Sequence, residues 1–221
     1  DPGLAQGAGA LIEAEQTWRY FKGTQEPSVP MSAWRQLAFD DASWAGGRAA
    51  IGYGESFIKT TLGDMYGGYT TVYLRKTFTV TDPTVINRLT LAVRFDDGFN
   101  AWINGIFVAG NNVPGRELTF DRTASSARED DAFAEFTLPP PAGYLVGGVN
   151  VLAVQLLNVT KSTSSDAFFD CRLFGASGAP RGPTPGARNS VYAANAAPQL
   201  RQASHFPAQP VSGEEVLITI K

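Results

Sequence analysis

The sequence predicts an all-β protein, an antiparallel β-sandwich of the jelly-roll type with an extended C-terminal appendage. One observation is the alternation of apolar and polar residues in 89–94 (LTLAVR), the two-residue period that is typical of a half-buried strand. Another is Asn104-Gly105 between two apolar segments, because both residues tolerate the positive φ angles of a type I′ hairpin turn. A third is a series of about eight short strand-like segments, with no capped helical period between them.

The N-terminal half of the chain supplies two strands separated by long loops. Residues 18–23 (WRYFKG) are predicted to form a short aromatic strand, and 24–33 a loop rich in Pro and Ser. Residues 34–44 (WRQLAFDDASW) are a loop or short strand that ends in an Asx-type turn. The Gly-rich segment 50–69 is expected to be irregular. Apolar residues alternate in the strand 71–80 (TVYLRKTFTV), which an Asp-Pro pair ends.

The C-terminal half supplies five further strands and a long polar loop. The strands are predicted at 86–94, 99–109, 132–138, 149–157 and 167–174, and the loop at 110–130. Asp96-Asp97-Gly98 is expected to form a tight turn between the first two of these strands. A run of three prolines closes the third. Residues 149–157 (VNVLAVQLL) are nearly all apolar, which is typical of a central strand buried on both faces.

Composition divides the chain into four segments. Small residues make 1–14 a flexible lead-in, and the predicted strands place one domain over 15–175. Residues 176–190 (ASGAPRGPTPGARNS) have the composition of a linker. Residues 191–221 are an extended tail or the beginning of a truncated immunoglobulin-like domain, because so short a piece buries no independent core. Since the chain begins with Asp-Pro-Gly, we expect a processed protein or a piece of a longer one.

Charge and residue usage exclude several classes of function. A net charge of -3 and a pI near 5.2 provide no basic surface for nucleic acid. No apolar run approaches the roughly 20 residues that insertion into a membrane needs. Cys171 and His205 are the only residues of their types, so a disulfide within the chain, a multi-Cys zinc site and a two-His metal site are excluded. One histidine in a Pro-rich tail also argues against a catalytic triad, and we expect no enzyme.

Several carboxylates are candidates for a structural calcium site. Calcium prefers carboxylate and carbonyl oxygens, and Asp96 and Asp166 lie in predicted turns where both are available. Glu13 and Glu15 would face one side of a strand and so could meet a single ion. The alternative is that the aspartates serve as turn residues that accept backbone N–H groups. Asp97 has the same two interpretations, as a turn residue or as a ligand contact.

Aromatic residues are the predicted platform for a ligand. Sugar rings have apolar faces that stack on aromatic rings, while their hydroxyls bind polar groups. The candidate rings are Tyr53, Tyr66, Tyr69, Trp102 and Trp44. Core packing is the alternative for any one of them. Arg75 and Arg94 lie on predicted strands, where each would contact a sugar or pair with Asp96 or Asp97 across the sheet.

An ordered set of short motifs carries a family resemblance. It comprises 18–20 (WRY), Trp34, 39–41 (FDD), 43–44 (SW), 51–54 (IGYG), 73–76 (YLRK) with Phe78, 95–99 (FDDGF), 103–105 (ING), 112–115 (NVPG), 150–155 (NVLAVQ) and 164–166 (SSD). The set resembles galactose-binding-like jelly-roll modules over roughly residues 15–175. It is similar to the N-terminal sugar-binding domain of glycoside hydrolase family 2 and to modules of large secreted bacterial proteins. Residues 183–189 are similar to the closing segment of lamin-tail-like modules, and 198–221 to the first strands of an immunoglobulin-like domain.

The resemblance implies a function of binding rather than catalysis. It implies a non-catalytic carbohydrate-binding module of a secreted or surface-located bacterial multidomain protein, with polysaccharide and the neighbouring domains as partners. For 164–166 it implies a structural role. The site residues predicted from these arguments are Tyr53, Tyr66, Tyr69, Trp102, Arg75 and Asp97, with Asp96, Asp166, Glu13 and Glu15 as ligands of a possible calcium ion. The alternative function is a structural spacer that positions neighbouring domains, which a lack of exposed coplanar aromatic rings would favour.

Overall fold

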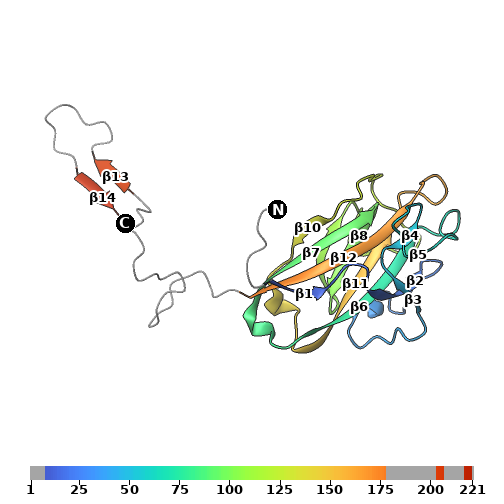
Figure 1. Ribbon diagram of the computed structural model, residues 1–221, viewed down its shortest axis with the longest axis horizontal. Helices are drawn as coiled ribbons and strands as arrows, with labels where there is room; N and C mark the ends of the chain where they lie inside the picture. The colour runs from blue at the N-terminus through green and yellow to red at the C-terminus, as the bar shows by residue number, and fades with distance from the viewer. Residues whose placement is uncertain (1–7, 178–202, 207–216, 221) are drawn as a thin grey trace. The chain divides into compact units, whose positions relative to one another are not determined.

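The computed structural model describes residues 8–177, 203–206 and 217–220 (Figure 1). The chain forms two compact units, 1–178 and 179–221. The described part of the second unit is one antiparallel pair, β13 (Ala203–Phe206) with β14 (Leu217–Ile220). Residues 178–190 of the predicted linker, which include the lamin-tail-like segment 183–189, lie outside the described residues, and so does the side chain of His205. The roles predicted for them remain predictions.

The first unit is built from two six-stranded sheets, which confirms the all-β sandwich prediction. Sheet I has the order β10-β7-β12-β4-β5, with β1 also paired to β12. Its strands are β1 (Ala8–Ile12), β4 (Ile51–Tyr53), β5 (Thr60–Thr61), β7 (Ile86–Asp96), β10 (Ala134–Thr137) and β12 (Ala167–Ser177). Every pair in this sheet is antiparallel except β4 with β5.

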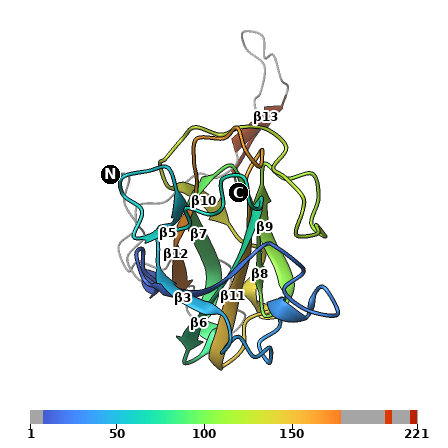
Figure 2. The same cartoon turned by 90° about the vertical axis from the view of Figure 1, so that its right-hand side faces the viewer.

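Sheet II has the order β3-β2-β6-β11-β8-β9 and is antiparallel throughout. Its strands are β2 (Thr17–Lys22), β3 (Ala45–Arg48), β6 (Thr71–Val80), β8 (Gly98–Ile103), β9 (Ile106–Asn111) and β11 (Gly148–Leu157). Three short 3₁₀ helices lie between strands: η1 (Ala33–Arg35), η2 (Pro83–Val85) and η3 (Pro141–Gly143). Figure 2 shows strands of sheet I, such as β7 and β12, beside strands of sheet II, such as β8 and β11.

Alternation along the strands places one apolar set between the sheets. Leu91 and Val93 of β7 and Phe169 of β12 point inward, as do Leu152 and Val154 of β11. Every one of these side chains is fully buried, because the two inner faces interdigitate as in other β-sandwiches. This main core joins the two sheets into one unit.

A second apolar cluster lies on the outer face of sheet II. Trp34, Trp44, Tyr73, Trp102 and Ala153 form it, and the first two come from the segment between β2 and β3. Trp34 sits edge-on to both Tyr73 and Trp102, with ring centroids 5.0 and 5.5 Å apart. Because this segment covers the sheet from outside, β11 is buried on both faces, as its continuous apolar sequence predicts.

The two turns in the middle of the chain behave differently. Asn104 and Gly105 have φ angles of 50° and 86°, so the predicted hairpin joins β8 to β9. Asp96-Asp97-Gly98 was expected to be a similar tight turn between neighbouring strands. It instead carries the chain from β7 in sheet I to β8 in sheet II.

The described part of the chain contains no helix with the length and hydropathy of a membrane span.

Candidate functional site

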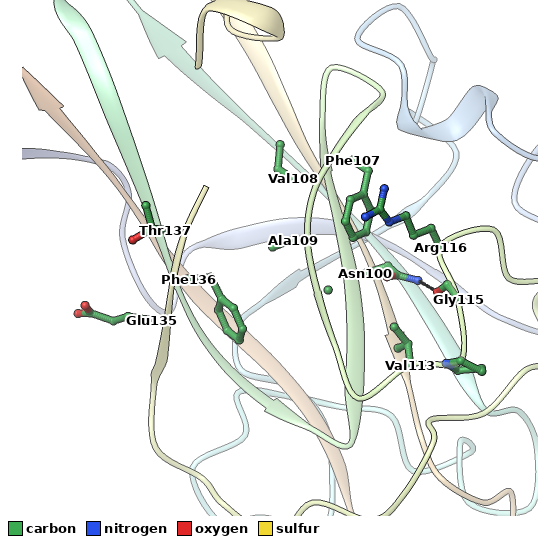
Figure 3. A pocket seen from close by; sticks show the side chains of 12 residues that line it. Asn100, Phe107, Val108, Ala109, Val113, Gly115, Arg116, Glu135, Phe136 and Thr137 are labelled. Atoms are coloured by element: carbon green, nitrogen blue, oxygen red, sulfur yellow. Dashed lines mark hydrogen bonds between the residues drawn. The ribbon is translucent and has the colours of Figure 1, made fainter. Parts of the chain in front are cut away.

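A groove of about 650 Å³ lies between the edge strand of each sheet (Figure 3). β9 ends sheet II and β10 ends sheet I, and residues of β8 and of the loop 113–116 complete the lining. Phe136 of β10 forms part of the lining and packs edge-on against Phe99 with a centroid distance of 5.3 Å. The side chains of Glu135 and Thr137 point away from the β9 side in Figure 3. The groove therefore has an aromatic side that is continuous with the core.

An arginine stacks on an aromatic ring at the opposite side of the groove. Cζ of Arg116 lies 4.2 Å from the ring centroid of Phe107, and Phe107 in turn packs edge-on against Trp102 at 6.0 Å. Arg116 is exposed, and among the described residues it forms no ion pair. Its guanidinium donors are therefore available to a ligand above a half-buried ring.

The groove also contains a buried acceptor. Asn100 is fully buried; its Nδ2 donates to the carbonyl oxygen of Gly115 at 2.8 Å, but its Oδ1 has no partner among the described residues. Such an unpaired group costs about 1–3 kcal/mol. Gly110 lies opposite Asn100 in the hairpin, and a Cβ there would stand 2.5 Å from that oxygen. Because Gly110 has no side chain, there is space for the amide oxygen of Asn100 at this position of the groove.

Five of the residues predicted from sequence come together elsewhere, at the end of the sandwich where β7 passes to β8. The hydroxyl of Tyr53 donates to the carbonyl oxygen of Ser164, and Tyr66 sits edge-on to Tyr53 at 6.3 Å. Asp97 accepts the backbone N–H groups of Arg128 and Val159, at 2.7 and 2.6 Å. The two donors lie 31 and 62 residues away in the sequence, so Asp97 holds the β7–β8 connection to two other segments and does not make the local hydrogen bond of a turn residue. Asp96 and Asp166 lie close enough to interact electrostatically with this group.

Asp96 is the most perturbed carboxyl in this part of the chain. Burial raises the pKa of Asp96 to about 8, and the neighbouring charges of Asp97 and Asp166 act in the same direction. One of its oxygens, Oδ1, is buried without a hydrogen-bond partner among the described residues. Burial also raises the pKa of Asp97. At neutral pH the Asp96 side chain is therefore mostly protonated.

The predicted aromatic platform is corrected by the burial of its rings. Trp102 is 1% exposed because Trp34 and the guanidinium of Arg35, 4.0 Å from its ring centroid, cover it. Tyr69 packs in the main core with its hydroxyl on Asp64, and Tyr53 and Trp44 are buried as well. Tyr66, at 56% exposed, is the candidate ring that solvent reaches. These residues consequently do not form a flat stacking surface.

The two predicted arginines are held by other partners than expected. Arg75 is 2% exposed and donates to Asp41 at 2.7 Å and to the carbonyl oxygens of Trp34, Gln36 and Phe39. Arg94 pairs with Asp131 at 2.8 Å, not with Asp96 or Asp97. Arg75 therefore fixes the segment that covers sheet II, and four of its five N–H donors are engaged there.

The predicted calcium ligands have separate surroundings. Glu15 pairs with Arg48 at 2.9 Å and with Lys59 at 3.8 Å, and Glu13 is exposed. One oxygen of Asp166 accepts from Ser165. Within residues 8–177 and the two short described strands, no group of three or more His, Cys, Asp or Glu side chains has the arrangement of a metal site. The four carboxylates are thus not assembled around one position.

Sequence reasoning missed the residues that line the groove. Asn100 and Phe107 lie on strands, and Arg116 follows the motif 112–115 in the long polar loop. A polar amide within an otherwise apolar strand was the available signal. Its meeting with Gly110 and Arg116 depends on the hairpin register, which shifts at a bulge between Ala101 and Trp102.

Comparisons with known proteins find this architecture in glycosidases. No protein-family model matches the sequence, and no curated protein matches it. The β-glucuronidase of Ruminococcus gnavus superposes with a TM-score of 0.51 at 9% identity, over 80% of this chain and 30% of the enzyme chain. A β-glucuronidase of an uncultured Clostridium sp. superposes with a TM-score of 0.50 at 12% identity, again over 80% and 30%. The chain therefore has the same β-sandwich fold as a part of these two proteins.

The fold predicted from the ordered sequence motifs is therefore confirmed. At 9–12% identity the likeness establishes the fold and leaves function to the site. The chain spans about 30% of the length of the β-glucuronidases that it matches.

Proposed function

We propose that this sandwich is a non-catalytic carbohydrate-binding module and that the groove between β9 and β10 is its glycan site. The observation that carries the proposal is the combination of a stacked ring, a free guanidinium and an unpaired buried amide oxygen along one groove. A sugar presents an apolar ring face and several hydroxyls, and these need an aromatic wall, donors and acceptors. The groove presents the ring and the donors, and its acceptor, Oδ1 of Asn100, is buried within the lining.

The fold comparison supports a carbohydrate role from an independent direction. The two proteins named above that share the sandwich are β-glucuronidases, so the fold occurs within carbohydrate-active chains. This chain corresponds to less than a third of their length, which fits an accessory module within a larger protein. The proposal extends to a secreted or surface-located bacterial multidomain protein with neighbouring domains as further partners, as the sequence resemblance implies. A structural calcium ion is also part of it, although the four predicted carboxylates do not converge.

The experiment is retention of the purified chain on a panel of soluble and insoluble polysaccharides, with and without a calcium chelator. Phe107→Ala and Arg116→Ala should each abolish or strongly weaken retention by the recognised glycan, because each removes one side of the ring contact. Phe133→Ala and Arg172→Ala are matched controls, since Arg172 stacks on Phe133 at 4.5 Å and neither residue lines the groove. Equal loss in the controls, or retention unaffected by the groove variants, would refute this site.

A structural spacer is the second candidate, and one observation favours it. Trp102, Tyr69 and Tyr53 pack inside the protein, so the described residues offer no pair of exposed coplanar rings from the predicted set. A spacer would need a stable sandwich and no ligand. If no glycan in the panel retained the purified chain, and the chain were shown to be folded, the result would support the spacer function.

A further inference from the structure

The side of the groove that carries Arg116 belongs to the outer face of sheet II. Asn100 and Trp102 point to that face, because the residues with which they alternate along β8 lie in the main core. The hairpin pairs Asn100 with Gly110 and Trp102 with Phe107, and paired residues point to the same side of a sheet. A Cβ at Gly110 would stand 2.5 Å from Oδ1 of Asn100 and 3.2 Å from Cζ of Phe107. The amide and the ring therefore converge at this glycine.

The loop that carries Arg116 is fixed on this face by the residues before and after it. Nδ2 of Asn100 donates to the carbonyl oxygen of Gly115 at 2.8 Å. Both carboxylate oxygens of Glu117 accept from Nη1 of Arg35, at 2.7 and 2.9 Å. Asn100 and Arg35 are buried, so the two neighbours of Arg116 are held by groups in the interior of the protein. The backbone at position 116 is consequently positioned before any ligand binds.

The side chain of Arg116 lies against the ring of Phe107. Its Cζ is 4.2 Å from the ring centroid, and Figure 3 shows the guanidinium beside the ring at the groove. Stacking covers one face of a guanidinium and leaves the N–H donors, which lie in its plane, free to bond a ligand. Arg116 is exposed, and within residues 8–177 these donors have no hydrogen-bond partner.

The carboxylates near Arg116 do not neutralise its charge. Glu117 follows it in the sequence but is paired with Arg35. Glu135 lines the groove from β10, and its side chain points away from the β9 side in Figure 3. In the part of the chain that the structure describes, Arg116 has no ion-pair partner. The β9 side of the groove therefore presents a positioned positive charge that is available to an anion.

We propose that Arg116 makes the groove selective for an acidic glycan by binding a carboxylate or sulfate group of the sugar. A guanidinium suits both groups, because its coplanar N–H pairs donate two parallel, charge-assisted hydrogen bonds to two oxygens. This inference rests on the proposed function, since the groove must first be a glycan site. It adds the class of glycan, which an aromatic lining alone does not define, because neutral and acidic sugars both have apolar ring faces.

The test compares glycans that differ in charge on a common backbone. The purified full chain is titrated with polygalacturonate, with alginate and with the methyl ester of each, and with dextran sulfate and dextran. The acidic member of at least one pair should bind about tenfold or more tightly than its neutral counterpart at about 0.15 M salt. This preference should narrow at about 1 M salt, where charges are more strongly screened. The uronates test a carboxylate, and dextran sulfate tests a sulfate ester.

Three variants test the residue. Arg116→Gln removes the charge and should bring the affinities for the acidic and neutral members of a pair close to equality. Arg116→Lys keeps the charge without the planar pair of donors and should keep part of the preference. Position 116 is exposed, so both variants should fold. Arg172→Gln is the matched control, because Arg172 also stacks on a ring, that of Phe133 at 4.5 Å, and does not line the groove. It should leave the preference unchanged.

The outcomes separate this inference from the proposed function. A neutral glycan that binds through Phe107 as tightly as its acidic counterpart would overturn the selectivity and leave the proposed function intact. A preference for acid that survives Arg116→Gln, or that Arg172→Gln weakens equally, would overturn it in favour of general charge attraction. If no neutral or acidic glycan bound the folded chain, the proposed function would be refuted, and this inference with it.

Discussion

Two surfaces of sheet II use the same residue types for opposite purposes. On its outer face, Arg35 lies 4.0 Å from the ring centroid of Trp102 and bonds Glu117 at 2.7 Å, and Arg75 is bound by Asp41 and three carbonyl oxygens. At its β9 edge, Arg116 stacks on Phe107 at a similar distance, 4.2 Å, but has no other partner among the described residues. An arginine that stacks on an aromatic ring therefore has a structural role where its N–H donors are hydrogen-bonded within the protein. Where those donors are free, the same pair is a candidate binding site.

The largest expected effect comes from breaking the covered face. Arg75→Ala should lower the free energy of unfolding by about 3–5 kcal/mol, because removing one partner of a buried, hydrogen-bonded pair leaves the others unpaired. Denaturant unfolding measures this change. Arg116→Ala is the control from the groove, and a loss for Arg75→Ala no greater than for that control would contradict the difference between the two surfaces.

Asp96 sharpens the comparison through pH, because it is buried and its Oδ1 has no hydrogen-bond partner among the described residues. Its pKa is about 8 in the folded protein and about 3.9 in an unfolded chain, so the folded state holds more protons between these values. The contribution of Asp96 to the free energy of unfolding is complete below pH 4 and is lost as the pH rises to 8. The free energy of unfolding then falls by up to about 1.4 kcal/mol per pH unit. The raised pKa of Asp97 has the same sign. Unfolding measured from pH 4 to 9 checks the profile.

Asp96→Asn should flatten this profile and raise stability above pH 7. Asp40→Asn, at an exposed position, is the matched control and should leave the slope as it is in the original chain. A free energy of unfolding that rises between pH 5 and pH 8, in the absence of these substitutions, would show that Asp96 is ionised in the folded protein.

Gly110→Ala closes the groove from within. The new Cβ would stand 2.5 Å from Oδ1 of Asn100, so we expect a loss of about 1–3 kcal/mol from overpacking. Glycan retention should fall with it, because the displaced amide no longer lines the groove in the same position. Gly9→Ala is a control, since a Cβ there meets no atom within 4 Å. Full retention by a folded Gly110→Ala protein would exclude Asn100 from the site.

The smallest expected effect is on the stability of the groove variants. Arg116→Ala should change the free energy of unfolding by less than about 0.5 kcal/mol, as is usual for exposed positions. Arg172→Ala is the control from the Phe133 pair. It should change thermal unfolding as little as Arg116→Ala does, but it should keep the glycan retention that Arg116→Ala loses. A cost for Arg116→Ala close to that expected for Arg75→Ala would assign Arg116 a structural role.

The sequence was sufficient for features that depend on neighbouring residues. The Asn104-Gly105 hairpin follows from local turn chemistry, and the double burial of β11 follows from its continuous apolar run. Strand ends were less exact, since β12 continues to Ser177, three residues beyond its predicted end at Phe174. The ordered motifs also anticipated the sandwich that the glycosidase structures share.

What the sequence could not provide is contact between distant segments. Trp102 is hidden because Trp34, 68 positions away, packs over it from a segment without any helical or strand period. The groove arises because β9, which carries Phe107, and β10, which carries Phe136, are edge strands of different sheets. Both depend on tertiary packing, which overrides the exposure that residue type suggests.

The free edges of β9 and β10 have a consequence for the behaviour of the protein in solution. An unpaired edge is a template on which a strand of another molecule can add, and among the described strands two such edges lie beside one groove. β10 limits this hazard with only four residues, a charged Glu135, and Pro139 and Pro140, which have no N–H to donate, shortly after its end. The chain can thereby leave this groove open without encouraging edge-to-edge aggregation.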